Sequence, residues 1–143
     1  MSTTLQRFHL AQGQGPGCAY EQALAELRSG RKQGHWIWFV LPQLRGLGQS
    51  PTSQHYGIEN LAEAQAYLAD PVLRKRLEAV IEAIDQQLQQ PGQTLTLLMG
   101  GELDATKTIS SLTLFSSAGL SSAAKLLDRL GSHCAVTQSK LGR

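Results

Sequence analysis

The chain has 143 residues, of which 41% are hydrophobic and 17% charged, and its formal net charge is +2. These values predict one domain over residues 1–143, with an ordered core at about 4–131 and a loose C-terminal tail. The small net charge argues against nucleic-acid binding, and no apolar run is long enough to span a membrane. The first twelve residues do not resemble a signal peptide, so we expect a cytoplasmic protein. We also expect it to be a monomer or a weak homodimer.

The first part of the chain alternates helical patterns with glycine-rich breaks. Residues 4–12 predict a short helix, which the run GQGPG at 13–17 ends. This run is better read as a plain loop than as a phosphate loop, because no strand precedes it and no Gly-Lys-Ser/Thr follows it. Residues 19–30 predict a second helix, with Gly30 as its C-terminal stop.

The stretch GHWIWFVLPQLRGLG, at 34–48, contains both tryptophans and is the predicted centre of the core. Residues 36–41 have strand propensity, but six apolar residues do not distinguish a strand from a buried helical turn. A turn-rich loop is expected at 46–52.

The second half of the chain carries the clearest helix signals. Asn60 with Glu63 forms a capping box, and Asp70-Pro71 begins a helix that Pro91-Gly92 ends. The apolar stripe of this helix is Val72, Leu73, Leu77, Val80, Ile81, Ile84 and Leu88. The basic run Arg74-Lys75-Arg76 is expected on its solvated face.

Three segments follow this long helix. Residues 95–99 are read as a short strand or a helical turn. Asp104 is expected to cap a helix to about Ser117, and Ser122 a helix to Leu130. The sequence thus predicts an all-α protein, a compact multi-helical domain of about six to seven helices.

Four motifs show a resemblance that covers about residues 5–130. They are LQRFHLAQ, YEQALAELRSGRKQGHWIWFVLPQLRGLGQSP, EAQAYLADPVL and KTISSLTLF. They resemble domain-of-unknown-function family 1810, which comprises small bacterial proteins sometimes labelled "calpastatin". The resemblance implies a mainly helical single domain, a helical conformation at 36–41, and no established activity.

The chain departs from the family pattern at four positions. Gly34 stands where relatives usually have serine before the His-Trp pair. Ala105 replaces part of an aspartate-rich turn, Ile109 a basic residue before the paired serines, and Leu112 a methionine. If that basic residue binds an anion in relatives, Ile109 does not reproduce the contact.

The aromatic stretch also contains the first candidate site residues. His35 has the side chain best suited to proton transfer near neutral pH, and the alternative is a structural role at a helix start. Trp36 and Trp38 would lie about 200° apart on a helix, so one is expected in the core. The other either lines a pocket wall or also packs in the core, and core packing is the preferred interpretation for each.

Polar residues after this stretch, and in the helix predicted from Asp104, suggest an anion site. Gln43 and Arg45 follow Pro42, and Lys107 would lie in the first turn of the Asp104 helix. Ser110 and Ser111, with neighbouring threonines, bind either a ligand or the carbonyl groups of their own helix.

The leading functional hypothesis is a pocket for a small polar or anionic ligand, such as a nucleotide or a phosphorylated or carboxylated metabolite. The expected ligand-binding residues are His35, Trp36, Trp38, Gln43, Lys107, Ser110, Ser111, Gln12 and Tyr20. The alternative is a protein–protein interaction module without catalysis. No metal site or cofactor is expected, because the four histidines lack ligand spacing. Nothing in the sequence decides whether the ligand is turned over.

Overall fold

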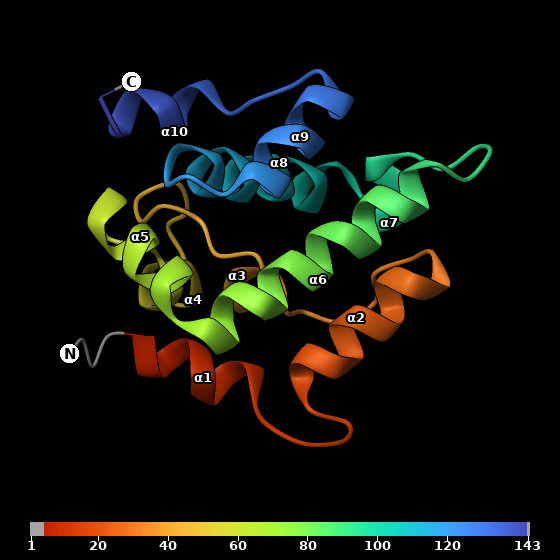
Figure 1. Cartoon of the computed structure of the whole chain (residues 1–143), viewed down its shortest axis with the longest axis horizontal. Helices are drawn as coiled ribbons and strands as arrows, with labels where there is room; N and C mark the ends of the chain where they lie inside the picture. Colours follow the sequence, from red (N-terminus) through yellow and green to blue (C-terminus); the bar gives the residue numbers. More distant parts are fainter. Residues whose placement is uncertain (1–4, 143) are drawn as a thin grey trace.

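The computed structural model describes residues 5–142 of the chain (Figure 1). These residues contain ten helices joined by loops. The first five are α1 (Gln6–Gln12), α2 (Ala19–Ser29), α3 (Ile37–Val40), α4 (Pro51–Tyr56) and α5 (Leu61–Ala69). The others are α6 (Pro71–Leu88), α7 (Leu95–Met99), α8 (Glu102–Ser117), α9 (Ser121–Leu130) and α10 (Ala135–Lys140). Within the described residues, one isolated parallel β-bridge pairs Leu44 with Ile58.

The fold is organised around two long helices, α6 and α8. Figure 1 shows α6 running diagonally across the molecule, with α2 alongside it and α8 and α9 above it. Helix α6 also contacts α5 and α7, and α8 packs against α9, α7, α10, α5 and α3. The two helices therefore touch nearly every other element.

Helix α6 confirms most of its predicted apolar stripe. The buried members are Leu73, Leu77, Val80, Ile81 and Ile84. Val72 is an exception, because it follows Pro71 in the first turn and its side chain is 47% exposed. Asp70 caps the helix as predicted, since its carboxylate accepts hydrogen bonds from the backbone N–H groups of Val72 and Leu73.

Three aromatic side chains join the two halves of the core. The ring centroid of Tyr67, on α5, lies 5.2 Å from that of Phe8 and 5.1 Å from that of Phe115. All three side chains are buried, and they connect α1 and α8 through α5. Such ring pairs add to the free energy gained from buried area.

The aromatic stretch forms a helical turn at α3, as the resemblance implied and against its strand propensity. Backbone N–H groups of Phe39 and Val40 donate to the carbonyl of Trp36, and that of Leu41 donates to Ile37. Trp36, Ile37, Val40 and Leu41 are buried. The backbone then extends, and Leu44 pairs with Ile58 beyond α4.

The prediction of six to seven helices was too low, because three short helices lie where loops or uncertain segments were expected. Helix α4 begins inside the predicted loop, where Ser50 caps it ahead of Pro51. Helix α7 settles residues 95–99 as helical. Helix α10 occupies the expected loose tail, with Thr137 fully buried and the thiol of Cys134 at its N-cap.

Two predicted caps were wrong. Helix α8 begins at Glu102, with Gly101 at the N-cap, so Asp104 lies inside its first turn. Helix α9 begins at Ser121, with Leu120 at the N-cap, so Ser122 does not cap it. Both shifts place a polar side chain inside the helix instead of at its start.

No helix in the described residues combines the length and the apolar character of a membrane span.

Backbone amides of α6 at Leu73 and Leu77 are expected to exchange with deuterium far more slowly than those of α10. Both leucines are buried in the middle of the structure, whereas α10 is short and mostly exposed. Hydrogen exchange followed by NMR checks this order. Equal protection in α6 and α10 would contradict the central position of α6.

Candidate functional site

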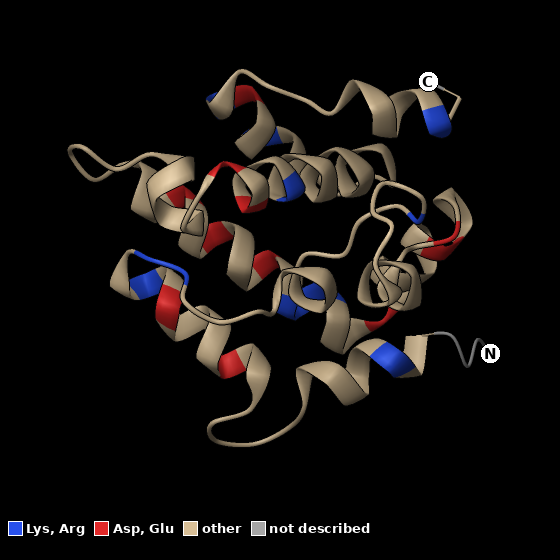
Figure 2. Cartoon of the chain, turned by 180° about the vertical axis from the view of Figure 1, so that it is seen from behind, with Lys and Arg blue, Asp and Glu red and all other residues tan. Residues whose placement is uncertain are grey.

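Two lysines share the carboxylate of Asp104. Lys32 Nζ lies 2.7 Å from Asp104 Oδ2, and Lys107 Nζ lies 3.3 Å from Oδ1. Lys32 comes from the segment between α2 and α3, whereas Lys107 stands one turn after Asp104 on α8. Figure 2 shows basic positions in the loop after α2 and in α8 on the same face of the molecule. The ion pairs therefore tie the segment before α3 to the first half of α8.

Each of these lysines also lies over the ring of one tryptophan. The Lys32 ammonium is 5.1 Å from the ring centroid of Trp36, and the Lys107 ammonium is 4.6 Å from that of Trp38. Such cation–π contacts are attractive, because the face of the ring is negative. We call these five residues, Lys32, Trp36, Trp38, Asp104 and Lys107, the lysine–tryptophan cluster.

The two tryptophans are buried to different extents, as expected for residues about 200° apart on a helix. Trp36 is 3% exposed, and its Nε1–H donates to Glu26 Oε1 over 2.9 Å. The same oxygen accepts the backbone N–H groups of Gln33 and Gly34. Trp38 is half-buried and packs at the edge of the core. Trp38 is therefore the tryptophan with a surface available to a ligand.

The carboxylate of Asp104, and that of Glu26 beside the cluster, stay ionised at neutral pH. Burial raises the pKa of Asp104, but the hydrogen bonds and charges of Lys32 and Lys107 outweigh burial and hold that pKa below its usual value. Burial also raises the pKa of Glu26. The hydrogen bonds that Glu26 accepts from Gly34, Gln33 and Trp36 outweigh the effect of burial, so the pKa is lowered. The two lysines thus share the one negative charge of Asp104.

Of the two lysines, Lys107 is the more exposed and has more hydrogen-bond donors left for another group. Lys32 is 8% exposed, and its ammonium already contacts Asp104 and donates to the carbonyl of Gly34 over 2.6 Å. The Lys107 side chain is 29% exposed and its one ion pair among the described residues is with Asp104. The earlier placement of Lys107 at a helix start was wrong, since α8 begins at Glu102.

His35 precedes Trp36 and is exposed, and it makes no hydrogen bond with the residues the structure describes. It is therefore positioned by the backbone beside the cluster and not by an orienting carboxylate. That His35 and Lys107 line one pocket stays a prediction.

Gln43 and Ser111 are two buried polar residues among the predicted site residues near α3 and α8. Gln43 is 3% exposed and Ser111 is 1% exposed. Within residues 5–142, neither Gln43 Nε2 nor Ser111 Oγ has a hydrogen-bond partner. The backbone carbonyl of Gln43 accepts from Ile58, so the side chain is not used to satisfy backbone groups near Pro42. Unpartnered buried polar atoms are rare in proteins and call for an explanation.

The other hydroxyl groups of α8 serve packing. Thr108 and Thr113 donate back to the carbonyls of Asp104 and Ile109, as one of the two interpretations held. Ser110 donates to the thiol of Cys134 over 3.2 Å, which connects α8 to α10. Ser110 therefore faces away from the lysine–tryptophan cluster toward the C-terminal helix.

Gln12 and Tyr20 belong to a second cluster, around Arg76. Gln12 is 1% exposed, and its Nε2 donates to the carbonyl of Phe39 and to the Tyr67 hydroxyl. Its Oε1 accepts from Arg76 over 3.3 Å, and the guanidinium of Arg76 lies 4.8 Å from the Tyr20 ring centroid. Arg76 is thus half-buried, and its expected place on a solvated face was wrong.

Sequence reasoning missed Lys32, Glu26 and Arg76 as members of these clusters. Each is a long charged side chain, and only the packing of α2, α6 and α8 shows where it points. The observed partners of Asp104, which was expected to cap its helix, are the two lysines. Lys32 in the quoted RKQGHW motif was the strongest available signal.

Asp104 also borders a hollow of about 470 Å³ at the start of α8. Gly100, Gly101, Glu102 and Leu103 line the rest of it. Gly100 and Gly101 have positive φ values of 81° and 150°, which allow the sharp turn between α7 and α8. Asp104 is the member of the lysine–tryptophan cluster that lines this hollow.

The comparisons with known proteins identify relatives and no activity. The family model described as "Protein of unknown function (DUF1810)" matches residues 2–140. The chain is 40% identical to the conserved hypothetical protein Rv1873 from Mycobacterium tuberculosis, whose crystal structure superposes with a TM-score of 0.85. That match covers 97% of this chain and 96% of the other. No curated protein matches the chain.

Proposed function

The chain belongs to the DUF1810 family, and we propose that it binds a small anionic ligand at the lysine–tryptophan cluster. The ligand is a nucleotide or a phosphorylated or carboxylated metabolite. The observation that carries this proposal is the Lys107 ammonium, half-exposed and held over the Trp38 ring at 4.6 Å. It offers a fixed positive charge beside an aromatic surface.

These two groups match the two parts of such a ligand. A half-buried indole can stack on a planar base or a sugar ring, and a lysine ammonium is a common phosphate ligand. Asp104 fixes the position of Lys107 without using all of its hydrogen-bond donors. The exposed imidazole of His35, which precedes Trp36, supplies a further polar group on the same segment.

Gln43 and Ser111 support a polar ligand near this segment. Each has a buried polar atom without a partner in the described protein. Leaving such an atom unsatisfied costs about 1–3 kcal/mol, which a ligand group could recover. Gln12, Tyr20 and Ser110 are not needed in this proposal, because their contacts lie with Arg76 and Cys134.

The alternative function is a protein–protein interaction module. Large apolar side chains are exposed at Leu10, Val72, Leu97, Leu103 and Val136. They lie on five different helices, whereas an interface of standard size needs a continuous patch.

A thermal-shift screen against nucleotides and central metabolites tests the proposal. A ligand present at about one hundred times its dissociation constant stabilises the folded protein by about 2.7 kcal/mol, which is readily detected as a rise in Tm. Mass spectrometry of the same samples shows whether a bound compound is converted. A screen without any stabilising anion, together with a stable dimer in solution, would favour the interaction module instead.

Lys107→Ala and His35→Ala are each expected to lower the free energy of unfolding by less than about 1 kcal/mol. Lys32 still pairs with Asp104 in the first variant, and His35 makes no described contact that the second would remove. Both should abolish the binding of any anion that the screen identifies, as measured by calorimetry. Lys75→Ala, which removes an exposed lysine of α6, is the matched control. Unchanged affinity in both variants would contradict the proposed site.

A further inference from the structure

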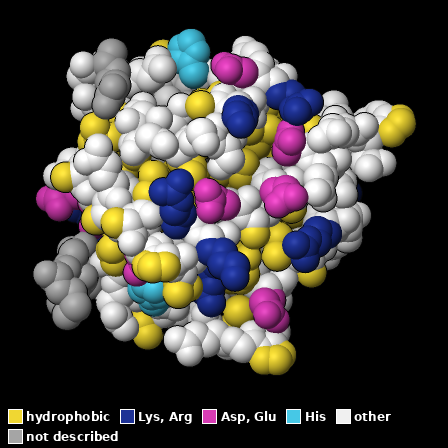
Figure 3. Space-filling view, viewed as in Figure 1, with side chains coloured by type: hydrophobic (Ala, Val, Ile, Leu, Met, Phe, Trp, Pro, Cys, Tyr) yellow, Lys and Arg dark blue, Asp and Glu magenta, His cyan; other side chains and the backbone are white. Residues whose placement is uncertain are grey.

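A second hollow lies between α6 and α9, on the face of the molecule seen in Figure 1. Its volume is about 340 Å³, within the range of small-molecule sites. Ile81 and Leu126, each 2% exposed, form its floor. Figure 3 shows acidic and basic side chains alternating with apolar ones over the middle of this face. The hollow is therefore apolar below and carries both charges at its rim.

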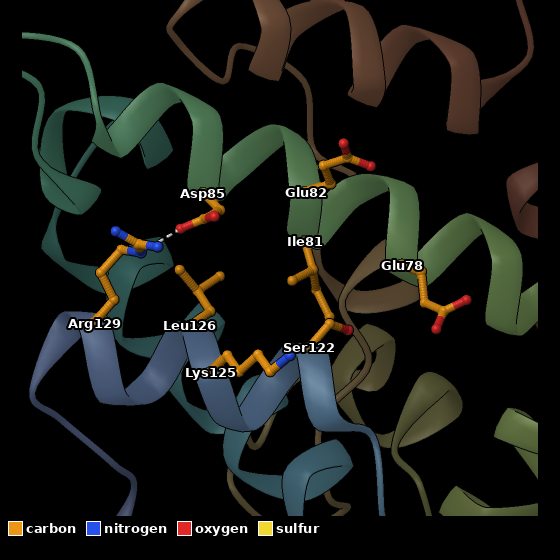
Figure 4. Close-up of a pocket in the computed structure, with 8 residues that line it drawn as sticks. All are labelled: Glu78, Ile81, Glu82, Asp85, Ser122, Lys125, Leu126 and Arg129. Atoms are coloured by element: carbon orange, nitrogen blue, oxygen red, sulfur yellow. Dashed lines mark ion pairs between the residues drawn. The ribbon is translucent and has the colours of Figure 1, made fainter.

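One end of this hollow is closed by an ion pair. Arg129 Nε lies 2.6 Å from Asp85 Oδ1, and Figure 4 shows the two side chains pointing toward each other from α9 and α6. Their charges cancel, so neither is left to attract a ligand. The charged groups that remain on the lining are Glu78, Glu82 and Lys125.

The α9 wall is suited to a carboxylate. In the described residues Lys125 has no ion pair, and Figure 4 shows its ammonium lying along α9 beside Ser122. Ser122 Oγ is buried and has no hydrogen-bond partner within residues 5–142. Helix α9 also begins without a side-chain cap from the described residues, which leaves its first N–H groups near Ser122 without that partner. An ammonium, a hydroxyl and a helix start together favour a bound anion.

The α6 wall is suited to an ammonium group. Glu78 lies at the end of the hollow opposite the Asp85–Arg129 pair, whereas Glu82 points away from α9 (Figure 4). The described ion pair of Glu78 is with the exposed Arg74, at 3.5 Å. Exposed pairs of this kind are weak, so the carboxylate can exchange this partner for a ligand.

We propose that this hollow binds an amino acid, or a similar zwitterion, with an apolar side chain. The carboxylate of the ligand lies at Lys125 and Ser122, its ammonium at Glu78, and its side chain on Ile81 and Leu126. This assignment is independent of the lysine–tryptophan cluster, because the two sites share no residue.

Binding of L-leucine and L-phenylalanine, followed by calorimetry and by NMR shifts of α6 and α9 amides, tests the assignment. We expect dissociation constants of about 1 mM, as is usual for a small ligand in an open site. Glycine lacks the apolar group, N-acetyl-leucine the ammonium and leucinamide the carboxylate, and each should bind about tenfold more weakly or worse. Equal binding of 1,5-diaminopentane would show a plain cation site and overturn the proposal.

Variants of the lining separate a real site from nonspecific binding. Lys125→Gln and Ser122→Ala should weaken leucine binding by about tenfold, while leucinamide, which has no carboxylate, should be unaffected. Lys75→Gln is the control, because it removes an exposed lysine of α6 that does not line the hollow. Circular dichroism confirms that each variant is folded. No binding of either amino acid at about 10 mM, or equal binding to all variants, overturns the assignment.

Discussion

Trp36→Ala is expected to lower the free energy of unfolding by about 3–5 kcal/mol, the usual cost of removing a buried aromatic side chain. The indole is 3% exposed and lies where α3 meets the core. Its removal leaves a cavity and deletes the hydrogen bond from Nε1 to Glu26. It also removes the ring over which the Lys32 ammonium lies. Urea denaturation measures the change through the midpoint and slope of the transition.

Trp38→Ala is the matched control for this variant. The two residues share one helical turn, but Trp38 is only half-buried and so loses less buried area. We expect less than half the destabilisation seen for Trp36→Ala, because the cost follows the area buried. If both variants unfolded at the same urea concentration as the wild type, the aromatic stretch would not be part of the core.

The two tryptophans also show which structural features the sequence predicts and which it does not. The rule that residues two apart face opposite sides of a helix predicts that one ring is buried and the other is not. It does not say which, because that depends on where α8 and Glu26 lie. The helical state of this turn came from the resemblance to a family, since local propensity favoured a strand.

A helix was predictable where a long run of apolar residues at helical spacing follows a capping residue. Asn60 and Asp70 each cap a helix as expected, by accepting from backbone N–H groups. Helices α4, α7 and α10 have five or six residues, too few to show a period, and α10 is capped by a thiol. Their formation depends on packing against α3 and α8, which a local pattern does not contain.

The candidate site was only partly predictable, for a related reason. Lys107 and Trp38 were both selected from their motifs, and the structure brings them into contact. Lys32 and Arg76 have long side chains whose direction is set by neighbours far along the chain. Lys32 reaches Asp104 on α8, and Arg76 reaches Gln12 on α1. Gln12 and Tyr20 contact Arg76, and their part in ligand binding stays a prediction.

The second large effect is expected for Asp104→Ala, which should lower the free energy of unfolding by about 2–4 kcal/mol at neutral pH. Removing one partner of a buried ion pair costs about 3–5 kcal/mol, and the partial exposure of Asp104 reduces this value. The variant leaves the Lys32 ammonium, whose side chain is 6% exposed, without a counter-charge. Lys107→Ala is the control, because it retains the pair between Lys32 and Asp104.

A double-mutant cycle separates the ion pair from other effects of the substitution. Lys32→Met removes the buried ammonium, so Asp104→Ala should cost much less in that background than in the wild type. An equal cost in both backgrounds would mean that Asp104 stabilises the fold through some contact other than Lys32.

The Asp104 contribution should also depend on pH in one direction only. Its pKa in the folded protein is lowered, since Lys32 and Lys107 outweigh the effect of burial, so the folded state binds a proton there less readily than the unfolded chain. The stabilisation is therefore complete above the unfolded pKa of about 4 and is lost as the pH falls through the lower folded value. The difference in unfolding free energy between the wild type and Asp104→Ala should stay constant from pH 8 to about pH 5 and shrink in more acidic solution. A difference that instead grew on acidification would show that the carboxyl is protonated in the native protein, and that the lysine–tryptophan cluster is not held by the charge of Asp104.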